Sequence, residues 1–335
     1  MQIFENYSLK AFNTFRIDCK AAFFAVVTSF SELRKILAEP NFLNLPKLFL
    51  GGGSNILFCR DYEGLVILIN LKGICDLGNG LIKVQAGENW HEFVLWSIHN
   101  GYNGIENLSL IPGNIGAAPI QNIGAYGVEL KDVFVELEAF HIDSDEIHTF
   151  DRESCNFSYR DSVFKNIHKG KYIILSVTLQ LRKDRIVNTS YGPIVDVLNQ
   201  MSISNPSPKD VSEAIISIRS SKLPDPKEIG NSGSFFKNPV IHKSHFEEIK
   251  IQYTDAPFYV VNDTDVKVPA AWLIEKAGWK GKRIGSYGVH DKQALVLVNY
   301  GCANGNDIYK LAKDIQSSVK DKFRIPLQME VNVIK

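Results

Sequence analysis

The chain has 335 residues, of which 45% are hydrophobic and 22% are charged, and these proportions exclude a fibrous or intrinsically disordered protein. A chain of this length exceeds the usual size of one hydrophobic core, so we expect two or three domains. Lys and Arg together number 37, as do Asp and Glu, and no long basic run is present, which argues against a nucleic-acid partner.

Cysteine and histidine spacing excludes two further classes of protein. The five cysteines are scattered without a CxxC pair, and the eight histidines lack ligand spacing beside carboxylates. We therefore expect neither a disulfide framework nor a metal site, and we expect a reducing compartment. The N-terminal segment lacks the apolar stretch of a signal peptide, and the longest apolar run, 64–69, is too short to span a bilayer. These features predict a cytoplasmic protein with no membrane partner.

In chain order, the first unit is predicted to be α+β and to cover 1–70. Runs rich in β-branched and aromatic residues predict strands at 22–28, 47–50 and 65–70. A helix is expected after Ser29, because Glu32 follows at the spacing of a capping box and Pro40 follows the last turn.

Two more units and a closing strand follow, at 71–205, 206–325 and 326–335. In 71–205 we predict a strand at 81–86, a helix from Asn89 to a left-handed cap at Gly101, and strands at 132–140 and 171–181. The segment 205–208, with two prolines, is expected to connect to the third unit. There the patterns predict helices at 211–220, 269–277 and 307–323 and strands at 234–240, 295–299 and 327–334.

Two glycine-rich segments are candidates for ligand binding. The segment 51–55, GGGSN, follows a predicted strand and forms either a tight turn or a backbone cradle for a phosphate, and the pattern favours neither. It lacks the lysine of a phosphate-binding P-loop and the spacing of a dinucleotide fingerprint. The longer segment 111–127 alternates glycines with amide side chains, which suits a backbone lying against a flat ligand. A structural crossover loop remains the alternative.

Three residues are candidates for the chemistry itself. Arg160 offers a guanidinium that suits a developing carboxylate or enolate charge, although by its context alone a surface pair with Asp161 is the commoner arrangement. Ser234 lies between a glycine and two phenylalanines and is either a proton donor or merely the start of a strand. Glu330 alternates with the apolar residues of the last strand and is either a solvated charge or a carboxylate lining a cleft.

Taken together, the motifs resemble one family closely. They are NTF at 13–15, GGGSN at 51–55, IPGNIGAAPIQNIGAYG at 111–127, YRDSVFK at 159–165, GSFFKNP at 233–239 and LQMEV at 327–331. In this order, and over essentially the whole chain, they are similar to the UDP-N-acetylenolpyruvoylglucosamine reductase family. The resemblance implies an α+β fold, with a two-subdomain FAD-binding region of the para-cresol methylhydroxylase/vanillyl-alcohol oxidase type followed by a C-terminal α+β substrate domain.

The resemblance also implies an activity and its residues. NADPH would reduce noncovalent FAD, which would then reduce the enolpyruvyl double bond of a UDP-sugar to give UDP-N-acetylmuramate for peptidoglycan synthesis. Ser234 resembles the family's proton donor, and Arg160 and Glu330 resemble the pair that stabilises the enolate-like intermediate. The resemblance places the cofactor on Gly51, Gly52, Gly53, Ser54, Asn55, Pro112, Gly113, Gly116, Ala117, Gln121, Asn122, Gly124, Ala125 and Tyr126.

For the nucleotide-sugar, the resemblance implies binding by Tyr191, Lys222, Asn238, Tyr259 and Gln293, with Lys222 offering a compact charge to phosphate. The Tyr191 segment and 246–269 resemble the longer form of the family, in which a mobile tyrosine loop covers the substrate, and Pro193 is expected to stiffen the turn after Tyr191. We expect a monomer. The alternatives are another FAD-dependent oxidoreductase of the same flavin-binding class and a nucleotide-sugar binding protein without catalysis.

Overall fold

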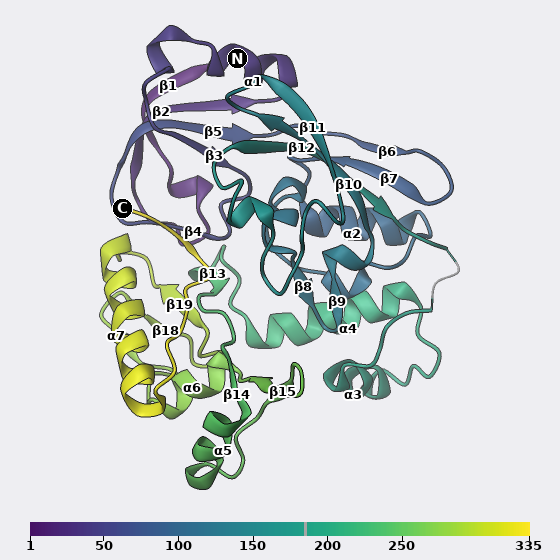
Figure 1. The fold of residues 1–335 in the computed structure, drawn as a ribbon, viewed down its shortest axis with the longest axis vertical. Coiled ribbons are helices and arrows are strands. Elements are labelled where there is room, and N and C mark those ends of the chain that lie inside the picture. The colour runs from purple at the N-terminus through teal and green to yellow at the C-terminus, as the bar shows by residue number, and fades with distance from the viewer. Residues whose placement is uncertain (184–185) are drawn as a thin grey trace. The chain divides into compact units, whose positions relative to one another are not determined.

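The computed structural model describes residues 1–183 and 186–335, and the chain divides into two compact units (Figure 1). The first unit comprises Met1–Asn6, Ala22–Gly52 and Glu63–Ser221. The second comprises Tyr7–Ala21, Gly53–Tyr62 and Lys222–Lys335.

The first unit is built on two sheets. One has the strand order β1 (Ile3–Ser8), β2 (Lys20–Val27), β5 (Tyr62–Ile69) and β3 (Lys47–Leu50), with β3 parallel to β5. The other has the order β11 (Glu146–Asp151), β10 (Phe134–His141), β12 (Tyr172–Gln180), β7 (Leu81–Gln85) and β6 (Ile74–Asp76), and its neighbours pair antiparallel. A short hairpin joins β8 (Gly124–Ala125) to β9 (Val128–Glu129).

Two helices of this unit begin where their capping residues predict. The Ser29 hydroxyl accepts the Glu32 N–H at the start of α1 (Phe30–Leu37), and the Asn89 side chain accepts the Glu92 N–H at 3.0 Å at the start of α2 (Trp90–His99). These bonds satisfy amide groups that have no partner inside the helix. Gly101, two residues beyond α2, has the left-handed φ of 75° that its capping role predicts.

Two further helices, α3 (Gly192–Gln200) and α4 (Pro208–Lys222), follow in the chain. The sequence predicts α4 and misses α3. Pro193, expected to stiffen a turn after Tyr191, instead lies in the first turn of α3, where its missing N–H costs nothing. The two helices share an apolar cluster that contains Ile194, Leu198 and Ile215.

The larger apolar clusters of the first unit lie on its sheets. One joins β5 and α1 to Phe140 of β10 and Leu175 of β12. The other packs Trp90 and Phe93 of α2 against β7, β10 and β12. Burying such side chains contributes about 1.5–3 kcal/mol each, so the segments that connect these strands start and end on a firmly held framework.

The second unit contains three sheets. Strands β13 (Gly230–Ser234), β19 (Val296–Asn299), β18 (Tyr287–Val289) and β17 (Arg283–Ile284) form one antiparallel sheet. Another has the order β14 (Val240–His242), β16 (Asp265–Lys267) and β15 (Tyr259–Val260), and the third pairs β20 (Asn332–Ile334) parallel to β4 (Ile56–Phe58). Helix α7 (Gly305–Phe323) packs on β18, β19 and α6 (Ala270–Lys276).

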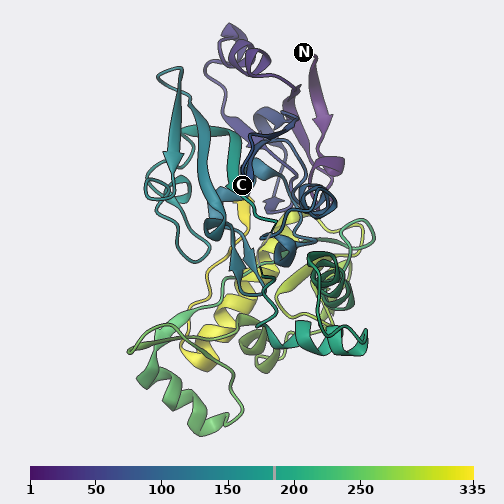
Figure 2. The same ribbon diagram turned by 90° about the vertical axis from the view of Figure 1, so that its right-hand side faces the viewer.

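Helix α5 (Lys243–Gln252) and the sheet of β14, β16 and β15 lie together at the lower end of this unit in both views (Figure 2). Two strand predictions are wrong in their extent. The predicted strand 234–240 ends at Ser234 and resumes only at Val240 as β14, and the predicted strand 327–334 reduces to β20 with a single bridge between Phe236 and Met329. Within the described residues, no helix is both long and apolar enough to cross a membrane.

Candidate functional site

In the first unit the two glycine-rich segments meet. A β-carbon added to Gly52 would lie 2.8 Å from Asn114 Oδ1 and 2.9 Å from Gly113 Cα, and one added to Gly51 would lie 3.7 Å from Asn114 Cβ. Carbon atoms pack at about 3.5–4.0 Å, so only a residue without a side chain lets the backbone at Gly52 approach Gly113 this closely. Two segments that the sequence proposed separately are therefore neighbours.

The segment 111–127 is fastened along its first half to the end of β7. Ile115 N–H donates to Glu88 O and Gly116 N–H donates to Ala86 O, both at 2.9 Å, and Trp90 N–H donates to Gly113 O at 3.0 Å. A β-carbon on Gly116 would lie 2.7 Å from Ala86 Cβ. These contacts hold the first half of the loop against the residues that directly follow β7.

Asn122 fixes the second half of the loop. It is fully buried with a left-handed φ of 42°, and its Nδ2 donates to Glu129 Oε2 and to Ser158 O, both at 3.1 Å, while its Oδ1 accepts the Lys131 N–H. Because the side chain is engaged inside the loop, contact with a cofactor would have to come from the backbone here. Among the other residues expected to bind the cofactor, Pro112 and Ala117 are exposed and Gln121, Ala125 and Tyr126 are half-buried.

Arg160 lies against the same loop. It occupies the corner of a tight turn between Ser158 and Asp161 with a φ of 55°, a left-handed conformation that is uncommon for a residue with a side chain. Its Nη2 donates to Gly124 O at 2.5 Å, while the Asp161 carboxylate accepts from Asn166. The guanidinium therefore contacts the loop backbone at Gly124.

A second guanidinium, which the sequence analysis missed, is buried nearby. Arg219 of α4 hydrogen-bonds to the Tyr126 hydroxyl, and its Nε is buried without a hydrogen-bond partner. Burial lowers the pKa of the Arg219 guanidinium, and the positive charge of Arg160 lowers it further. Burial raises the pKa of Tyr126. The sequence signal was an arginine directly after Ile218, in the buried stripe of α4 that also contains Ile215.

Tyr191, expected to bind substrate, also reaches this region. Its ring meets the ring of Tyr126 edge-on, with centroids 5.3 Å apart and an angle of 90°. The buried Asn107 side chain donates to Tyr126 O and to Asn188 O, both at 2.9 Å, so it ties the segment before Tyr191 to the hairpin turn. Tyr191 itself is 39% exposed.

In the second unit, the segments of Ser234 and Glu330 run side by side. Glu330 N–H donates to Phe235 O at 2.8 Å, and Lys237 N–H donates to Gln328 O at 2.9 Å. Ser234 is exposed and Glu330 is half-buried. Ser234 and Glu330 are distant in sequence, but Glu330 is hydrogen-bonded to the residue that directly follows Ser234.

Gly53 and Asn55 support the same region of the second unit. Asn55 Nδ2 donates to Glu330 O at 3.3 Å, and Asn55 O accepts from Asn332. Gly53 has a φ of 61°, and a β-carbon there would lie 2.0 Å from Phe12 O, so both sterics and conformation require glycine. Gly53 O in turn accepts the Thr14 N–H at 3.0 Å. Ser54 lies between them, half-buried.

The remaining residues expected to bind substrate have varied surroundings. Asn238 Oδ1 accepts the Ala270 N–H at 2.9 Å and so caps α6, and Gln293 Oε1 accepts the Leu295 N–H at 3.3 Å. Lys222 is exposed at the end of α4, and Tyr259 is 50% exposed in β15. Lys267 Nζ lies 5.8 Å from the centre of the Tyr259 ring.

The residues of the first unit fit a flavin. Backbone without a side chain is offered to a flat ring and a diphosphate by four glycines, Gly51, Gly52, Gly113 and Gly116. The orphaned Arg219 Nε is a donor that a ligand oxygen or nitrogen would satisfy. In the described part of the chain, no group of three or more His, Cys, Asp or Glu residues is arranged to hold a metal ion.

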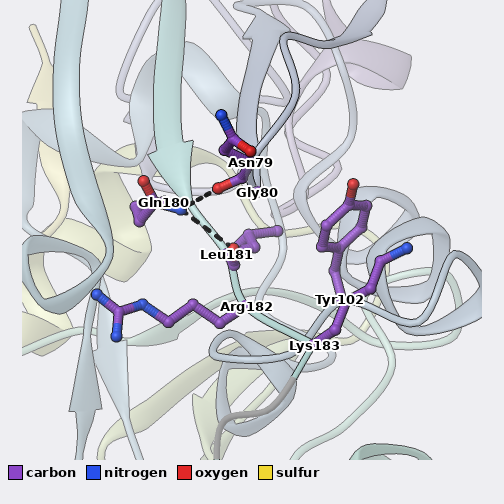
Figure 3. Close-up of a pocket in the computed structure, with 7 residues that line it drawn as sticks. All are labelled: Asn79, Gly80, Tyr102, Gln180, Leu181, Arg182 and Lys183. Atoms are coloured by element: carbon purple, nitrogen blue, oxygen red, sulfur yellow. Dashed lines mark hydrogen bonds between the residues drawn. The ribbon is translucent and has the colours of Figure 1, made fainter.

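An open polar pocket of about 620 Å³ lies elsewhere in the first unit, at the ends of β7 and β12 (Figure 3). Its cations do not converge, because Lys183 extends over the Tyr102 ring while Arg182 points to the opposite side (Figure 3). None of the residues expected to bind cofactor or substrate lines this pocket.

Comparisons with known proteins agree across the chain. A family model described as the C-terminal domain of UDP-N-acetylenolpyruvoylglucosamine reductase matches residues 225–334, and an FAD binding domain matches residues 21–150. The UDP-N-acetylenolpyruvoylglucosamine reductases of Flavobacterium johnsoniae and Amoebophilus asiaticus are 53% and 49% identical, and each alignment covers 100% of both chains. The crystal structure of UDP-N-acetylenolpyruvylglucosamine reductase from Thermus caldophilus has a TM-score of 0.69 at 21% identity, covering 100% of this chain and 98% of that chain.

Proposed function

Because the chain belongs to the UDP-N-acetylenolpyruvoylglucosamine reductase family, we propose that it reduces the enolpyruvyl double bond of UDP-N-acetylglucosamine enolpyruvate to give UDP-N-acetylmuramate. It is an FAD-dependent oxidoreductase of peptidoglycan precursor synthesis, with NADPH as reductant. The observation that carries this conclusion is the identity of 53% over the full length of both chains, together with matches to the cofactor domain and the C-terminal domain.

When bound, FAD supplies the two-electron chemistry, taking hydride from NADPH and passing it to the double bond. The chain's own residues hold the cofactor and manage charge. Gly51, Gly52 and the segment 112–126 are proposed to bind FAD noncovalently, supported by the close approach of Gly52 to Gly113. FAD is also proposed to contact the next three residues, Gly53, Ser54 and Asn55.

Three residues are proposed to act on the substrate. Hydride addition at one carbon of the double bond leaves negative charge on the carbon that bears the carboxylate, and Arg160 is the fixed cation proposed to stabilise that charge. The Ser234 hydroxyl is proposed to donate its proton to that carbon. Glu330 is proposed to act with Arg160 in stabilising the enolate-like intermediate, and the hydrogen bond between Glu330 N–H and Phe235 O, which places Glu330 beside the Ser234 segment, supports this role.

Five residues are proposed to bind the diphosphate and uridine of the substrate, with Lys222 offering its charge to phosphate; they are Tyr191, Lys222, Asn238, Tyr259 and Gln293. The half-exposed rings of Tyr191 and Tyr259 support this role, since an apolar ring with a polar tip can cover a bound ligand. We further propose a cytoplasmic monomer that binds neither nucleic acid nor membrane. The balanced charge and the five free cysteines support this location.

Stopped-flow absorbance of the flavin separates the two half-reactions and tests the proposal. Ser234→Ala is expected to leave flavin reduction by NADPH unchanged and to slow reoxidation by the enolpyruvyl UDP-sugar at least about 100-fold, because only the protonation step loses its acid. Ser232→Ala is the matched control, since its hydroxyl is buried without a partner in the same strand. Reoxidation at the parental rate in Ser234→Ala, or recovery of flavin colour by oxygen but not by the UDP-sugar, would refute the proposal.

A further inference from the structure

Strand β13 contains a β-bulge immediately before Ser234. In its pairing with β19, Asn231 is opposite Val298 and Ser234 is opposite Val296, so three steps on β13 match two steps on β19. Ser232 and Gly233 together therefore oppose a single residue. Gly233 has a φ of 69°, the left-handed conformation that a glycine bulge adopts.

The bulge decides on which side of the sheet Ser234 lies. Side chains alternate between the two faces of a strand, so in a regular strand a residue three positions after Asn231 would lie on the opposite face from Asn231. The extra residue cancels this alternation. Ser234 pairs with Val296, two positions from Val298, and so it shares the face of Asn231.

Asn231 holds the bulge closed. Its Oδ1 accepts the Gly233 N–H at 2.9 Å, and its Nδ2 donates to Pro224 O at 3.1 Å and to Ile229 O at 2.8 Å. Its own N–H donates to Thr14 O at 3.0 Å, and the residue is 3% exposed. An asparagine side chain has two donor hydrogens and one acceptor oxygen, and here all of them are used. The Asn231 side chain thus links the backbone of Pro224 and Ile229 to the backbone of the bulge by hydrogen bonds.

The chain is fixed again directly after the serine. Phe235 N–H donates to Leu295 O at 2.8 Å, and Phe235 and Phe236 are fully buried. Between the two fixed points lies Gly233, where an added β-carbon would meet nothing within 4 Å. A β-carbon at Gly233 therefore changes the backbone preference of the bulge without itself meeting a neighbouring atom.

We propose that Asn231 and the Gly233 bulge are a positioning device that directs the Ser234 hydroxyl toward the substrate carbon it protonates. This inference rests on the proton-donor role proposed for Ser234. The bulge determines on which face of the β13–β19 sheet the Ser234 hydroxyl lies. A misplacement of about 1 Å in such a group costs about 100-fold in rate.

Substitutions at Gly233 test the device. A β-branched residue strongly disfavours positive φ, whereas asparagine tolerates it. Gly233→Val is expected to slow reoxidation of the flavin by the UDP-sugar at least about tenfold, with flavin reduction by NADPH and UDP-sugar affinity within about twofold of the parent. Gly233→Asn is expected to retain most of the parental rate. Asn231→Ala should resemble Gly233→Val. Because Asn231 is buried and Gly233 is only half-buried, the Gly233 series keeps the test valid if Asn231→Ala fails to fold.

A double variant separates this inference from the proposed function. If the bulge acts through Ser234, Gly233→Val adds no further loss to Ser234→Ala. Equal loss of both half-reactions in Gly233→Val, parental reoxidation, or full additivity with Ser234→Ala would overturn the positioning role. An Ser234→Ala enzyme that reoxidises normally would instead overturn the proposed function itself.

Discussion

The contact between Gly52 and the segment 113–114 gives the most direct test of the proposed cofactor region. In Gly52→Ala the new methyl group would lie 2.9 Å from Gly113 Cα and 2.8 Å from Asn114 Oδ1. The first distance is about 0.6 Å shorter than the closest comfortable carbon contact of about 3.5 Å. Because Gly113 is itself backbone held by Trp90 N–H at 3.0 Å, the methyl group cannot be accommodated by rotating a side chain.

The expected cost is that of overpacking, about 1–3 kcal/mol. The methyl group is expected to displace the segment 113–114 in the cofactor-free protein, and FAD binding must then restore its position. The packing cost therefore becomes a loss of FAD affinity of about 5-fold to about 100-fold, since about 1.4 kcal/mol corresponds to a factor of ten. Gly51→Ala is the matched control, because its methyl group would lie at ordinary contact distances of 3.7 to 4.0 Å. Because Gly51 is itself proposed to contact FAD, Gly51→Ala is expected to lose some FAD affinity, but less than Gly52→Ala.

The assay is titration of cofactor-free protein with FAD, followed by quenching of flavin fluorescence, with circular dichroism to verify that both variants fold. A Gly52→Ala protein that binds FAD within twofold of the parent would refute the packing argument. An equal loss in Gly51→Ala would refute it as well, because the effect would then not follow from the distance to Gly113.

Two further predictions follow from charge. Arg160→Lys is expected to lower turnover at least about tenfold, since an ammonium cannot keep both the bond to Gly124 O and a forked contact with a carboxylate; steady-state rates at saturating NADPH measure this, and parental turnover would contradict the assigned role. The second prediction concerns pH, because burial lowers the pKa of His290 below its ordinary value of 6.5. The unfolded chain therefore binds the proton more readily than the folded chain does. The stability that neutral His290 contributes is complete above pH 6.5 and is lost as pH falls below that value. Urea unfolding between pH 7.5 and 5.5 should show a shallower decline in His290→Asn than in the parent, and parallel declines would contradict this.

The sequence by itself predicted local structure well where capping and periodicity agree. Ser29 and Asn89 mark helix starts that the structure confirms, and the strand predicted at 47–50 is β3. Prediction from the sequence failed where one local pattern is compatible with two different structures. Phe235 and Phe236 have the apolar character of a strand, yet they leave the ladder after the bulge at Gly233, and Gly192–Pro193 began a helix although the same pair also suits a turn.

The residue types proposed to carry the chemistry were all evident from the sequence because they reside in short motifs. They are a serine, a guanidinium, a carboxylate and glycine-rich backbone. Only the tertiary structure decided which motifs are neighbours. Glycine allows close approach anywhere, but it takes folding to bring Gly52 to Gly113 and Phe235 O to Glu330 N–H. Arg219 became a candidate only when burial left its Nε without a partner. Contacts between distant segments depend on the packing of the whole core, which no local pattern of residues encodes.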